Sequence, residues 1–440
     1  MKNNRLRAKI IECVVIVLVI PYAAYLIGYS AVFPGMNDGS DTAKQKILLK
    51  DDIEKTIEGS IVDNTEEPIT QAEKEGIPAV CLSQSYGALV GYNSPVYGIS
   101  GLRARYSDYL FKRDRRTHKG STIKLTTLNE VQERAYRAIK GTDGTAIVIE
   151  NKTGRIIALA STNKDVTIDV NDLSNWNQIV NHDGSLIPNW EKASAPGSVI
   201  KVASSALIIC EGLQQQIYHD TGREIVSGHS FVNYEGHSYG NVNLCRGLVK
   251  SVNTYYAHME TIIGTPKLRS CYESFCIGGE NAKIALDFCD ITSDHGLKNS
   301  DEIEAAAAAF GQGKLMLTPI QMAMIGQCVA NGGVMMKPYI VDKIYTVNGK
   351  TSYKGENLVL STAVDSRTAD EITKYMKEAG ESYGFPKGIA AKTGTAEIGS
   401  FNRASILAFN DKYTVLVVED HTHKKGKQLV SAAKSIFNVL

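Results

Sequence analysis

The sequence predicts an α/β protein of the α+β type, in which an antiparallel sheet is flanked by helices. Two apolar runs, 144–150 and 155–161, are joined by Asn-Lys-Thr-Gly, which predicts an antiparallel hairpin. Three more strand-like runs, 388–398, 405–410 and 413–418, follow one another near the C-terminus. Helical patterns occupy much of the chain between these two groups of strands.

An apolar segment near the start predicts a membrane anchor. Residues 1–9 form a basic tail, and residues 10–33 are mostly apolar. This run is about as long as a helix must be to cross a bilayer. Basic residues before it predict a cytoplasmic N-terminus and an extracytoplasmic body. A cleaved signal peptide is the alternative, but the run is long for one and shows no obvious cleavage site. We therefore expect a single-pass signal anchor in the cell membrane.

Two modules are expected after the anchor. Residues 34–120 form a small N-terminal module with a helical stretch at 41–57 and a basic, solvated run at 112–119. Residues 121–440 form the large domain, which opens with a strand and then a helix, at 121–128 and 128–139. Further helices are expected at 199–210, 242–263, 304–310, 319–331, 367–379 and 428–440, and irregular structure at 163–190 and 211–240.

Charge and cysteine content exclude several kinds of function. The chain has 48 Lys+Arg against 47 Asp+Glu, which gives no sign of nucleic-acid binding. The cysteines do not form a disulfide framework; Cys271, Cys276 and Cys289 lie close enough in sequence for a bridge, but free thiols are equally expected. No Cys or His spacing is typical of a zinc site, so we expect no cofactor.

The stretch Ala193–Lys201 is the strongest candidate for chemistry. Pro196-Gly197 interrupts the preceding segment, and an apolar helix begins directly after it. Ser198 is therefore placed at a helix N-terminus, where free N–H groups favour developing negative charge. Lys201 follows at i+3, on the same helix face, where an amine can activate a serine nucleophile. Alone, such a pair is more often a helix cap and a solvated lysine.

Two further elements in the right order strengthen this candidate. Ser251-Val252-Asn253 follows downstream, and Lys392-Thr393-Gly394 lies near the C-terminus. Together with Ser-x-x-Lys they match a known serine acyl-transferase signature. A second trio exists: Ser121–Lys124, Lys152–Gly154 and Ser161–Asn163. We reject that second trio, because its elements are crowded, wrongly ordered, and include a predicted hairpin turn.

The surrounding segments also resemble one family. Residues 240–256 are similar to the neighbourhood of its second motif, 310–323 to its glycine-rich approach to a helix, and 391–397 to its third motif. From about residue 56 to the end, the chain resembles the penicillin-binding proteins, specifically the monofunctional class B D,D-transpeptidases. The resemblance implies the penicillin-binding transpeptidase, or serine β-lactamase-like, fold.

The chemistry of an acyl transfer and the resemblance together assign roles to the motif residues. Ser198 is expected to be the nucleophile and Lys201 its base, with a pKa lowered by burial and by the nearby cation Lys392. Ser251 is expected to pass on the proton, and Asn253 to hold Lys201 and the substrate amide. Substrate-binding roles fall to Thr393, Gly394 and Thr395. The hydroxyls of Thr393 and Thr395 are expected to hold the terminal carboxylate, with Lys392 nearby as a point charge. The backbone N–H groups of Ser198 and Thr395 are expected to form the oxyanion hole.

The chain departs from the family at two places. Members often carry arginine at the position of Glu58 and glutamate at that of Arg103, so we do not expect here the ion pairing that this glutamate would make. Members also usually have an aromatic-rich strand after the third motif. Here residues 401–410 take its place, and both tryptophans, Trp176 and Trp190, lie elsewhere.

The resemblance implies a peptidoglycan D,D-transpeptidase that cross-links stem peptides and is acylated by penicillin and related β-lactam antibiotics. Residues before Ser121 are too few to polymerise glycan strands, so a separate polymerase in the membrane is the expected partner. One alternative is a catalytically weak scaffold or β-lactam sensor. Another is a membrane-anchored serine β-lactamase, although the carboxylates Glu211, Glu224 and Glu235 stand in no recognisable deacylation motif.

Overall fold

A computed structural model describes residues 50–182 and 186–440. The chain divides into two units, Met1–Lys55 and Thr56–Leu440, and the second carries all the motifs. The predicted anchor at 10–33 lies outside the described residues. Among those that are described, no helix is both long enough and apolar enough to span a membrane.

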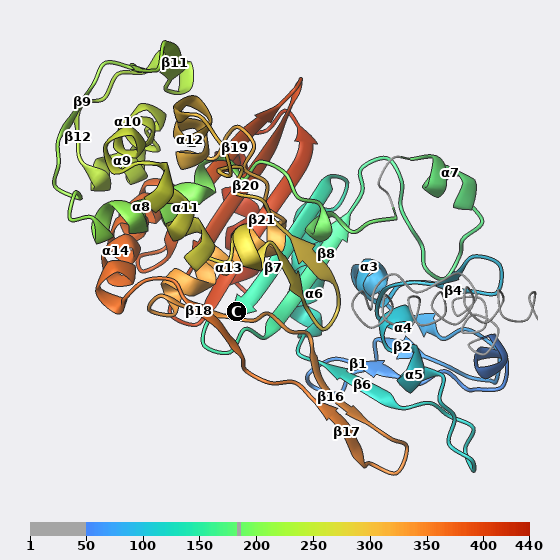
Figure 1. Cartoon of the computed structure of the whole chain (residues 1–440). Helices are drawn as coiled ribbons and strands as arrows, with labels where there is room; N and C mark the ends of the chain where they lie inside the picture. Colours follow the sequence, from blue (N-terminus) through green and yellow to red (C-terminus); the bar gives the residue numbers. More distant parts are fainter. Residues whose placement is uncertain (1–49, 183–185) are drawn as a thin grey trace, which may run out of the picture. The chain divides into compact units, whose positions relative to one another are not determined.

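A five-stranded antiparallel sheet forms the centre of the second unit (Figure 1). Its strand order is β19-β20-β21-β7-β8. The strands are β7 (Asp143–Glu150), β8 (Ile156–Thr162), β19 (Ala390–Ile398), β20 (Phe401–Phe409) and β21 (Tyr413–Thr422). The predicted hairpin and the three C-terminal strands are therefore confirmed. Strand β20 begins four residues earlier than expected, because the polar residues at its start still pair with β19.

Helices cover both faces of this sheet. Helices α6 (Asn129–Ile139) and α15 (Val430–Phe437) pack on one face through a buried apolar cluster. Alternate residues of β20 follow the strand period: Ile406 joins this cluster, while Leu407 faces α13 (Pro319–Ala330). A side chain at Gly326 of α13 would collide with Leu407, so this glycine allows close helix–sheet packing. The predicted helices at 128–139, 319–331 and 428–440 are confirmed.

The remaining helices of the large domain lie at one end of the sheet (Figure 1). They are α8 (Lys201–Cys210), α9 (Leu244–Lys250), α10 (Asn253–Ile263), α11 (Thr265–Ser274), α12 (Glu302–Ala309) and α14 (Ser366–Ser382). A separate short helix, α7 (Trp176–Asn181), interrupts the 163–190 stretch, which was expected to be irregular. Helix α14 packs against the edge strand β19 and against α8. This arrangement puts the first two motifs beside the third.

The prediction of irregular structure at 211–240 is wrong. Two small antiparallel hairpins form there, pairing β9 (Tyr218–Asp220) with β12 (Gly240–Val242) and β10 (Arg223–Val226) with β11 (His229–Val232). Their short, half-exposed strands carry little apolar alternation, so the sequence gives no strand signal. Other short strands are β13 (Lys283–Ala285), β14 (Asp290–Thr292), β15 (Val334–Met336) and β18 (Val359–Thr362).

A second sheet joins the N-terminal module to a hairpin of the large domain. Its order is β1-β6-β16-β17, from β1 (Ile61–Val62), β6 (Thr122–Leu125), β16 (Val341–Tyr345) and β17 (Thr351–Lys354). The other elements of the module are β2 (Thr70–Gln71), β3 (Val80–Cys81), α3 (Gly87–Val90), β4 (Asn93–Ser94), β5 (Gly98–Ile99), α4 (Gly101–Arg105) and α5 (Ser107–Leu110). The predicted strand at 121–128 thus pairs with the module rather than with the central sheet.

The module contains a buried ion pair at the two positions where the chain departs from its family. Arg103 Nε lies 2.7 Å from Glu58 Oε1, and both side chains are almost fully buried. Arg103 also donates to the carbonyls of Gly91 and Ala79, and Glu58 accepts from the Ala79 N–H. Glu58 and Arg103 therefore pair with each other, and backbone N–H and carbonyl groups complete their hydrogen bonds.

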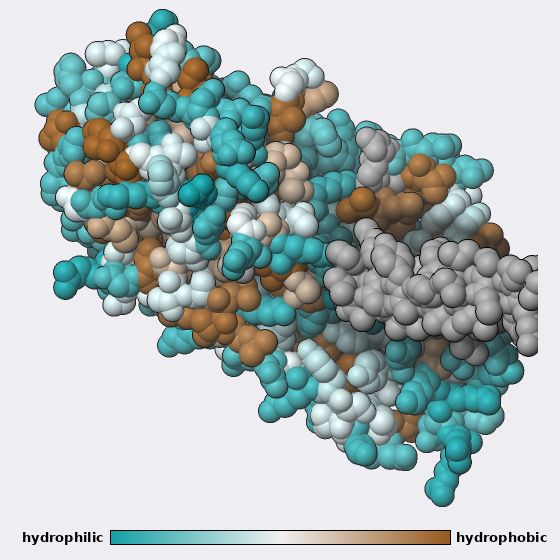
Figure 2. All heavy atoms as spheres, viewed as in Figure 1, coloured by the Kyte–Doolittle hydropathy of each residue, from teal (hydrophilic) through white to brown (hydrophobic). Residues whose placement is uncertain are grey.

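The surface of the described part is mostly hydrophilic on the face shown in Figure 2, with apolar side chains in small separate groups. Exposed apolar residues such as Val96 and Ile225 are normal on a folded domain. The described cysteines, including Cys271, Cys276 and Cys289, are free thiols.

Candidate active site

Ser198 lies in a tight turn at the start of a buried helix. The turn is a 3-10 helix, Gly197–Ile200, which continues directly into α8, so the helix predicted from 199 begins with a 3-10 turn. Gly197 has φ +60, and a side chain there would collide with the backbone of Thr395. Only glycine lets the turn approach strand β19 this closely. Ser198 is partly exposed, and its hydroxyl makes no hydrogen bond to the residues the structure describes.

Lys201 is the first residue of α8 and is completely buried. Its Nζ donates to Asn253 Oδ1 at 2.6 Å, to the Ser251 carbonyl at 2.8 Å and to Ser251 Oγ at 3.2 Å. Burial, and then the charge of Lys392, hold the pKa of Lys201 well below its usual value. Since Ser198 and Lys201 are three residues apart, they lie on one face. Lys201 is thus a buried amine with a lowered pKa, one helical turn after Ser198.

Ser251 occupies the turn between α9 and α10. Its backbone is left-handed, with φ 59 and ψ 43, a conformation that is uncommon for a residue other than glycine. The turn directs Ser251 Oγ to both lysines, because this oxygen accepts from Lys392 Nζ at 2.8 Å as well as from Lys201. A hydroxyl that accepts twice keeps its own proton free to donate. Ser251 is therefore well placed to pass a proton on.

Lys392 is buried on the edge strand β19 and donates to Ser251 Oγ and to the Thr393 carbonyl. Burial lowers the pKa of Lys392 to about 7. Two buried amines that share one hydroxyl cannot both be charged at low cost, since like charges disfavour each other's protonation. The geometry therefore disfavours two charged amines in the site at once.

The other residues of the third motif lie along the same strand. Thr393 Oγ1 donates to the Tyr383 hydroxyl at 3.3 Å, and Thr395 Oγ1 accepts from the Gly426 N–H at 3.1 Å. Gly394 has no room for a side chain, which would meet Ser405 Oγ. Because β19 is an edge strand, one side of its backbone stays unpaired beside the Ser198 turn. All of the predicted site residues thus belong to one site.

Sequence reasoning missed the residues that support Asn253. Asp220 is buried and accepts from Thr254 Oγ1, Asn233 Nδ2 and the N–H groups of Gly222 and Tyr239. Asn233 Oδ1 in turn accepts from the Thr254 N–H. This network fixes the start of α10, where Asn253 stands. A polar Asp and Asn within a stretch of weak pattern carry no recognisable signal.

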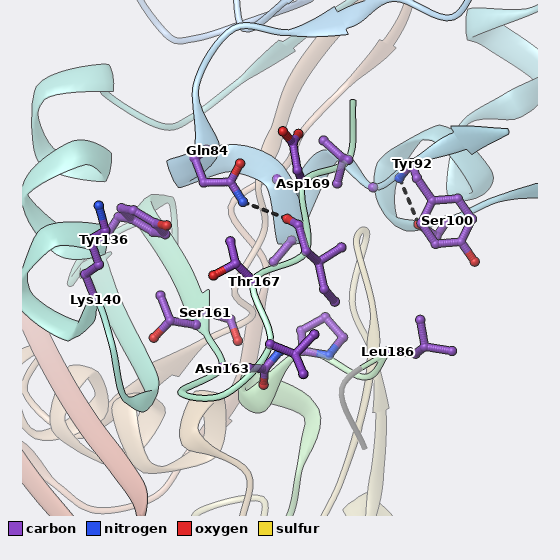
Figure 3. Close-up of a pocket in the computed structure, with 18 of the residues that line it drawn as sticks. Gln84, Tyr92, Ser100, Tyr136, Lys140, Ser161, Asn163, Thr167, Asp169 and Leu186 are labelled. Carbon is purple, nitrogen blue, oxygen red and sulfur yellow. Dashed lines mark hydrogen bonds between the residues drawn. The ribbon is translucent and has the colours of Figure 1, made fainter. Parts of the chain in front are cut away.

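The rejected second trio is not brought together. Ser161 and Asn163 line a cavity of about 440 Å³ between the N-terminal module, α6 and the end of β8, as do Lys140 and Tyr136 (Figure 3). The Lys152–Gly154 turn lies at the opposite end of the β7–β8 hairpin, since Gly144 pairs with Thr162. This cavity contains none of the motif residues described above.

The three glutamates considered for a hydrolase have partners elsewhere. Glu211 pairs with Lys267, Glu224 binds His258 and the Tyr218 hydroxyl, and Glu235 contacts Tyr234. In the described part of the chain, none of these carboxylates contacts Ser198 or Lys201.

Comparison with known proteins agrees with this geometry. Residues 144–438 match the family model of the penicillin-binding protein transpeptidase domain. The chain belongs to this family. A peptidoglycan D,D-transpeptidase, PbpA, of Mycolicibacterium smegmatis is 27% identical over 72% of this chain and 72% of its own length. The PbpA of Mycobacterium tuberculosis is 27% identical over 67% of this chain, which spans 64% of that protein.

Solved structures share the fold. The D,D-transpeptidase domain of a peptidoglycan glycosyltransferase from Eggerthella lenta superposes with a TM-score of 0.77 at 24% identity, covering 87% of this chain and 98% of that one. PBPA from Mycobacterium tuberculosis gives 0.78 at 21% identity, covering 87% and 99%. The penicillin G acyl-enzyme complex of that protein gives 0.76 at 22%, again covering 87% and 99%. The expected family and the transpeptidase fold are confirmed, and the membrane anchor stays a prediction.

Proposed function

We propose that this protein is a peptidoglycan D,D-transpeptidase that forms an acyl-enzyme at Ser198. The observation that carries the proposal is the hydroxyl of Ser251, which accepts hydrogen bonds from two fully buried lysines beside the Ser198 turn. Burying two amines side by side costs free energy whenever both are charged. A pair of them sharing one hydroxyl suits proton transfer to and from a serine. Family membership supports the same reaction.

Acylation follows from these positions. Ser198 Oγ attacks the carbonyl carbon of the penultimate D-Ala in a stem peptide, and its proton passes to the neutral amine of Lys201. The tetrahedral intermediate collapses when the peptide C–N bond breaks. As this bond breaks, the proton moves from Lys201 through the Ser251 hydroxyl to the leaving nitrogen of the terminal D-Ala. An amine from a second stem peptide then attacks the ester carbonyl, loses a proton through Ser251 to Lys201, and expels Ser198 Oγ, which takes a proton back from Lys201.

The third motif supplies binding and charge stabilisation. The N–H groups of Ser198 and Thr395 act on the developing oxyanion, as such donors do in acyl transfer. Thr393 and Thr395 hold the terminal carboxylate with their hydroxyls, with Lys392 close to them. Penicillin is an alternative acyl donor for Ser198, as it is for PBPA of Mycobacterium tuberculosis, of which a penicillin G acyl-enzyme is known.

Membrane attachment and a polymerase partner belong to the same proposal. The basic residues 1–9 and the apolar residues 10–33 support a signal anchor that holds residues 34–120 and the catalytic domain outside the cell membrane. A separate glycan polymerase in the membrane would supply the strands that this enzyme cross-links. No contact in the described residues favours a hydrolase or a scaffold over a transpeptidase.

The test is cross-linking of defined stem peptides. The protein is incubated with a donor peptide that ends in D-Ala-D-Ala and an acceptor peptide with a free side-chain amine. Mass spectrometry should detect the cross-linked product and one released D-Ala for each cross-link. Release of D-Ala without cross-linked product would indicate a hydrolase, and no reaction with an otherwise folded protein would favour the scaffold.

A further inference from the structure

Two chain segments, one hydrogen-bonded to Asn253 and the other to Thr395, contact each other in a way that the reaction does not require. In the first segment, Asn253 Nδ2 donates to the Val232 carbonyl at 3.4 Å. In the second segment, the Gly426 N–H donates to Thr395 Oγ1 at 3.1 Å. Tyr234 stands two residues after Val232, and Lys425 directly precedes Gly426. A contact between Tyr234 and Lys425 thus links two segments that border the reactive centre.

Tyr234 and Lys425 do meet. The Lys425 Nζ lies 4.2 Å from the centroid of the Tyr234 ring and also contacts its hydroxyl. Glu235 adds a carboxylate, which accepts from the Tyr234 hydroxyl and lies 4.0 Å from Lys425 Nζ. We call Tyr234, Glu235 and Lys425 the clasp. It combines a cation–π contact with a hydrogen bond and an ion pair.

Both ends of the clasp are fixed at their bases. Asn233, next to Tyr234, is buried and tied to Asp220 and Thr254. Gly426 is buried against β19, where a side chain would collide with the Gly394 carbonyl. Between these anchors, Glu235 has φ 53, a strained value for a residue with a side chain. The surrounding structure thus maintains a conformation that directs Tyr234 and Glu235 at Lys425.

The contact itself is weak enough to open. Tyr234 is 52% exposed, and the side chains of Lys425 and Glu235 are 50% and 59% exposed. Exposed cation–π contacts and ion pairs are each worth little in water. A donor that must first open the clasp is therefore slowed only about fivefold in reaching Ser198. This factor corresponds to about 1 kcal/mol, at about 1.36 kcal/mol per factor of ten.

We propose that Tyr234 and Lys425 determine which acyl donors reach Ser198, by closing across the segments beside Asn253 and Thr395. The inference rests on the proposed function. Asn253 holds the amide of the donor, so the part of the donor beyond that amide must pass next to Val232 and Tyr234. A donor with a large group there has to open the clasp, whereas a small donor does not.

The experiment compares acylation rates for two probes. One is the bare penicillin nucleus with a free amine, and the other is a penicillin whose side-chain amide carries a fluorophore. Lys425→Ala and Tyr234→Ala should each raise the second-order acylation rate of the large probe about fivefold and leave the small probe unchanged. The double variant should match the single ones, because all three lose the same contact.

Lys427→Ala is the matched control. Lys427 is exposed on the same basic segment and makes no ion pair with the described residues, so neither probe should respond. Equal effects on both probes, additive single variants, or a Lys427→Ala effect as large as that of Lys425→Ala would contradict the clasp. Absence of label from wild type and all variants would instead contradict the proposed function, and the clasp with it.

Discussion

Replacing Lys201 with methionine removes the amine and preserves most of the side-chain volume. A positioned general base contributes about 10²- to 10⁴-fold to rate, or about 2.7–5.4 kcal/mol. We therefore expect the acylation of Ser198 by penicillin to slow by that factor in Lys201→Met. Lys201→Arg should slow it at least as much, because a guanidinium stays protonated and cannot accept a proton.

Lys201→Met should also change the free energy of unfolding. Lys201→Met leaves Asn253 Oδ1 and the Ser251 carbonyl without their donor, which costs about 1–3 kcal/mol. The pKa of Lys201 is lowered in the folded state, so protonation at low pH destabilises the native protein and the penalty fades as pH rises. Because methionine carries no such penalty, the stability gap between wild type and variant should narrow as pH falls.

The assay is rapid-mixing acylation with a fluorescent penicillin, combined with thermal unfolding between mildly acid and alkaline pH. A near-normal acylation rate in Lys201→Met would show that another group is the base. A stability gap that widens toward acid pH would show that Lys201 is not a buried amine with a lowered pKa.

Three further outcomes follow from the structure. Arg103→Met should destabilise the protein by about 3–5 kcal/mol in chemical denaturation. A double variant that exchanges Glu58 and Arg103 should recover little of the wild-type stability, because the Ala79 N–H then faces a guanidinium. Full recovery of the wild-type stability would refute this polarity argument. Asp220→Ala should lower both the melting temperature and the penicillin acylation rate, since it releases Thr254 beside Asn253; an unchanged acylation rate would refute the positioning role. The penicilloyl adduct of wild type should persist for minutes to hours when followed by mass spectrometry, whereas turnover within seconds would indicate a β-lactamase.

The central sheet and the motif residues were predictable because their signals are local. Apolar strands such as 144–150 show their period directly, and the motifs at Ser198, Ser251 and Lys392 have fixed spacing and order. The sequence could not predict that Lys201 and Lys392 both donate to the hydroxyl of Ser251. The shared hydrogen bonding depends on the left-handed backbone at Ser251, a conformation that a serine in the sequence does not predict.

Residues whose role depends on distant partners were not predictable. Arg403 stands in the strand that lacks the family's aromatic residues, and it is buried, pairs with Asp420, and donates to the carbonyls of Leu317 and Lys192. It thereby ties β20 to the segment that precedes the Ser198 turn and to Leu317, which pairs with Ser194 of that segment. Its partners lie far away in sequence, so no pattern around 401–410 could indicate them.

The central claim, that Ser198 is the acylated nucleophile, is tested most directly by intact-protein mass spectrometry after incubation with penicillin, followed by peptide mapping. Wild type should gain the mass of one penicillin, located on the peptide that contains Ser198, and Ser198→Ala should gain none while keeping its melting temperature. Unlabelled wild type at high penicillin concentration, or an equally labelled Ser198→Ala, would contradict the claim.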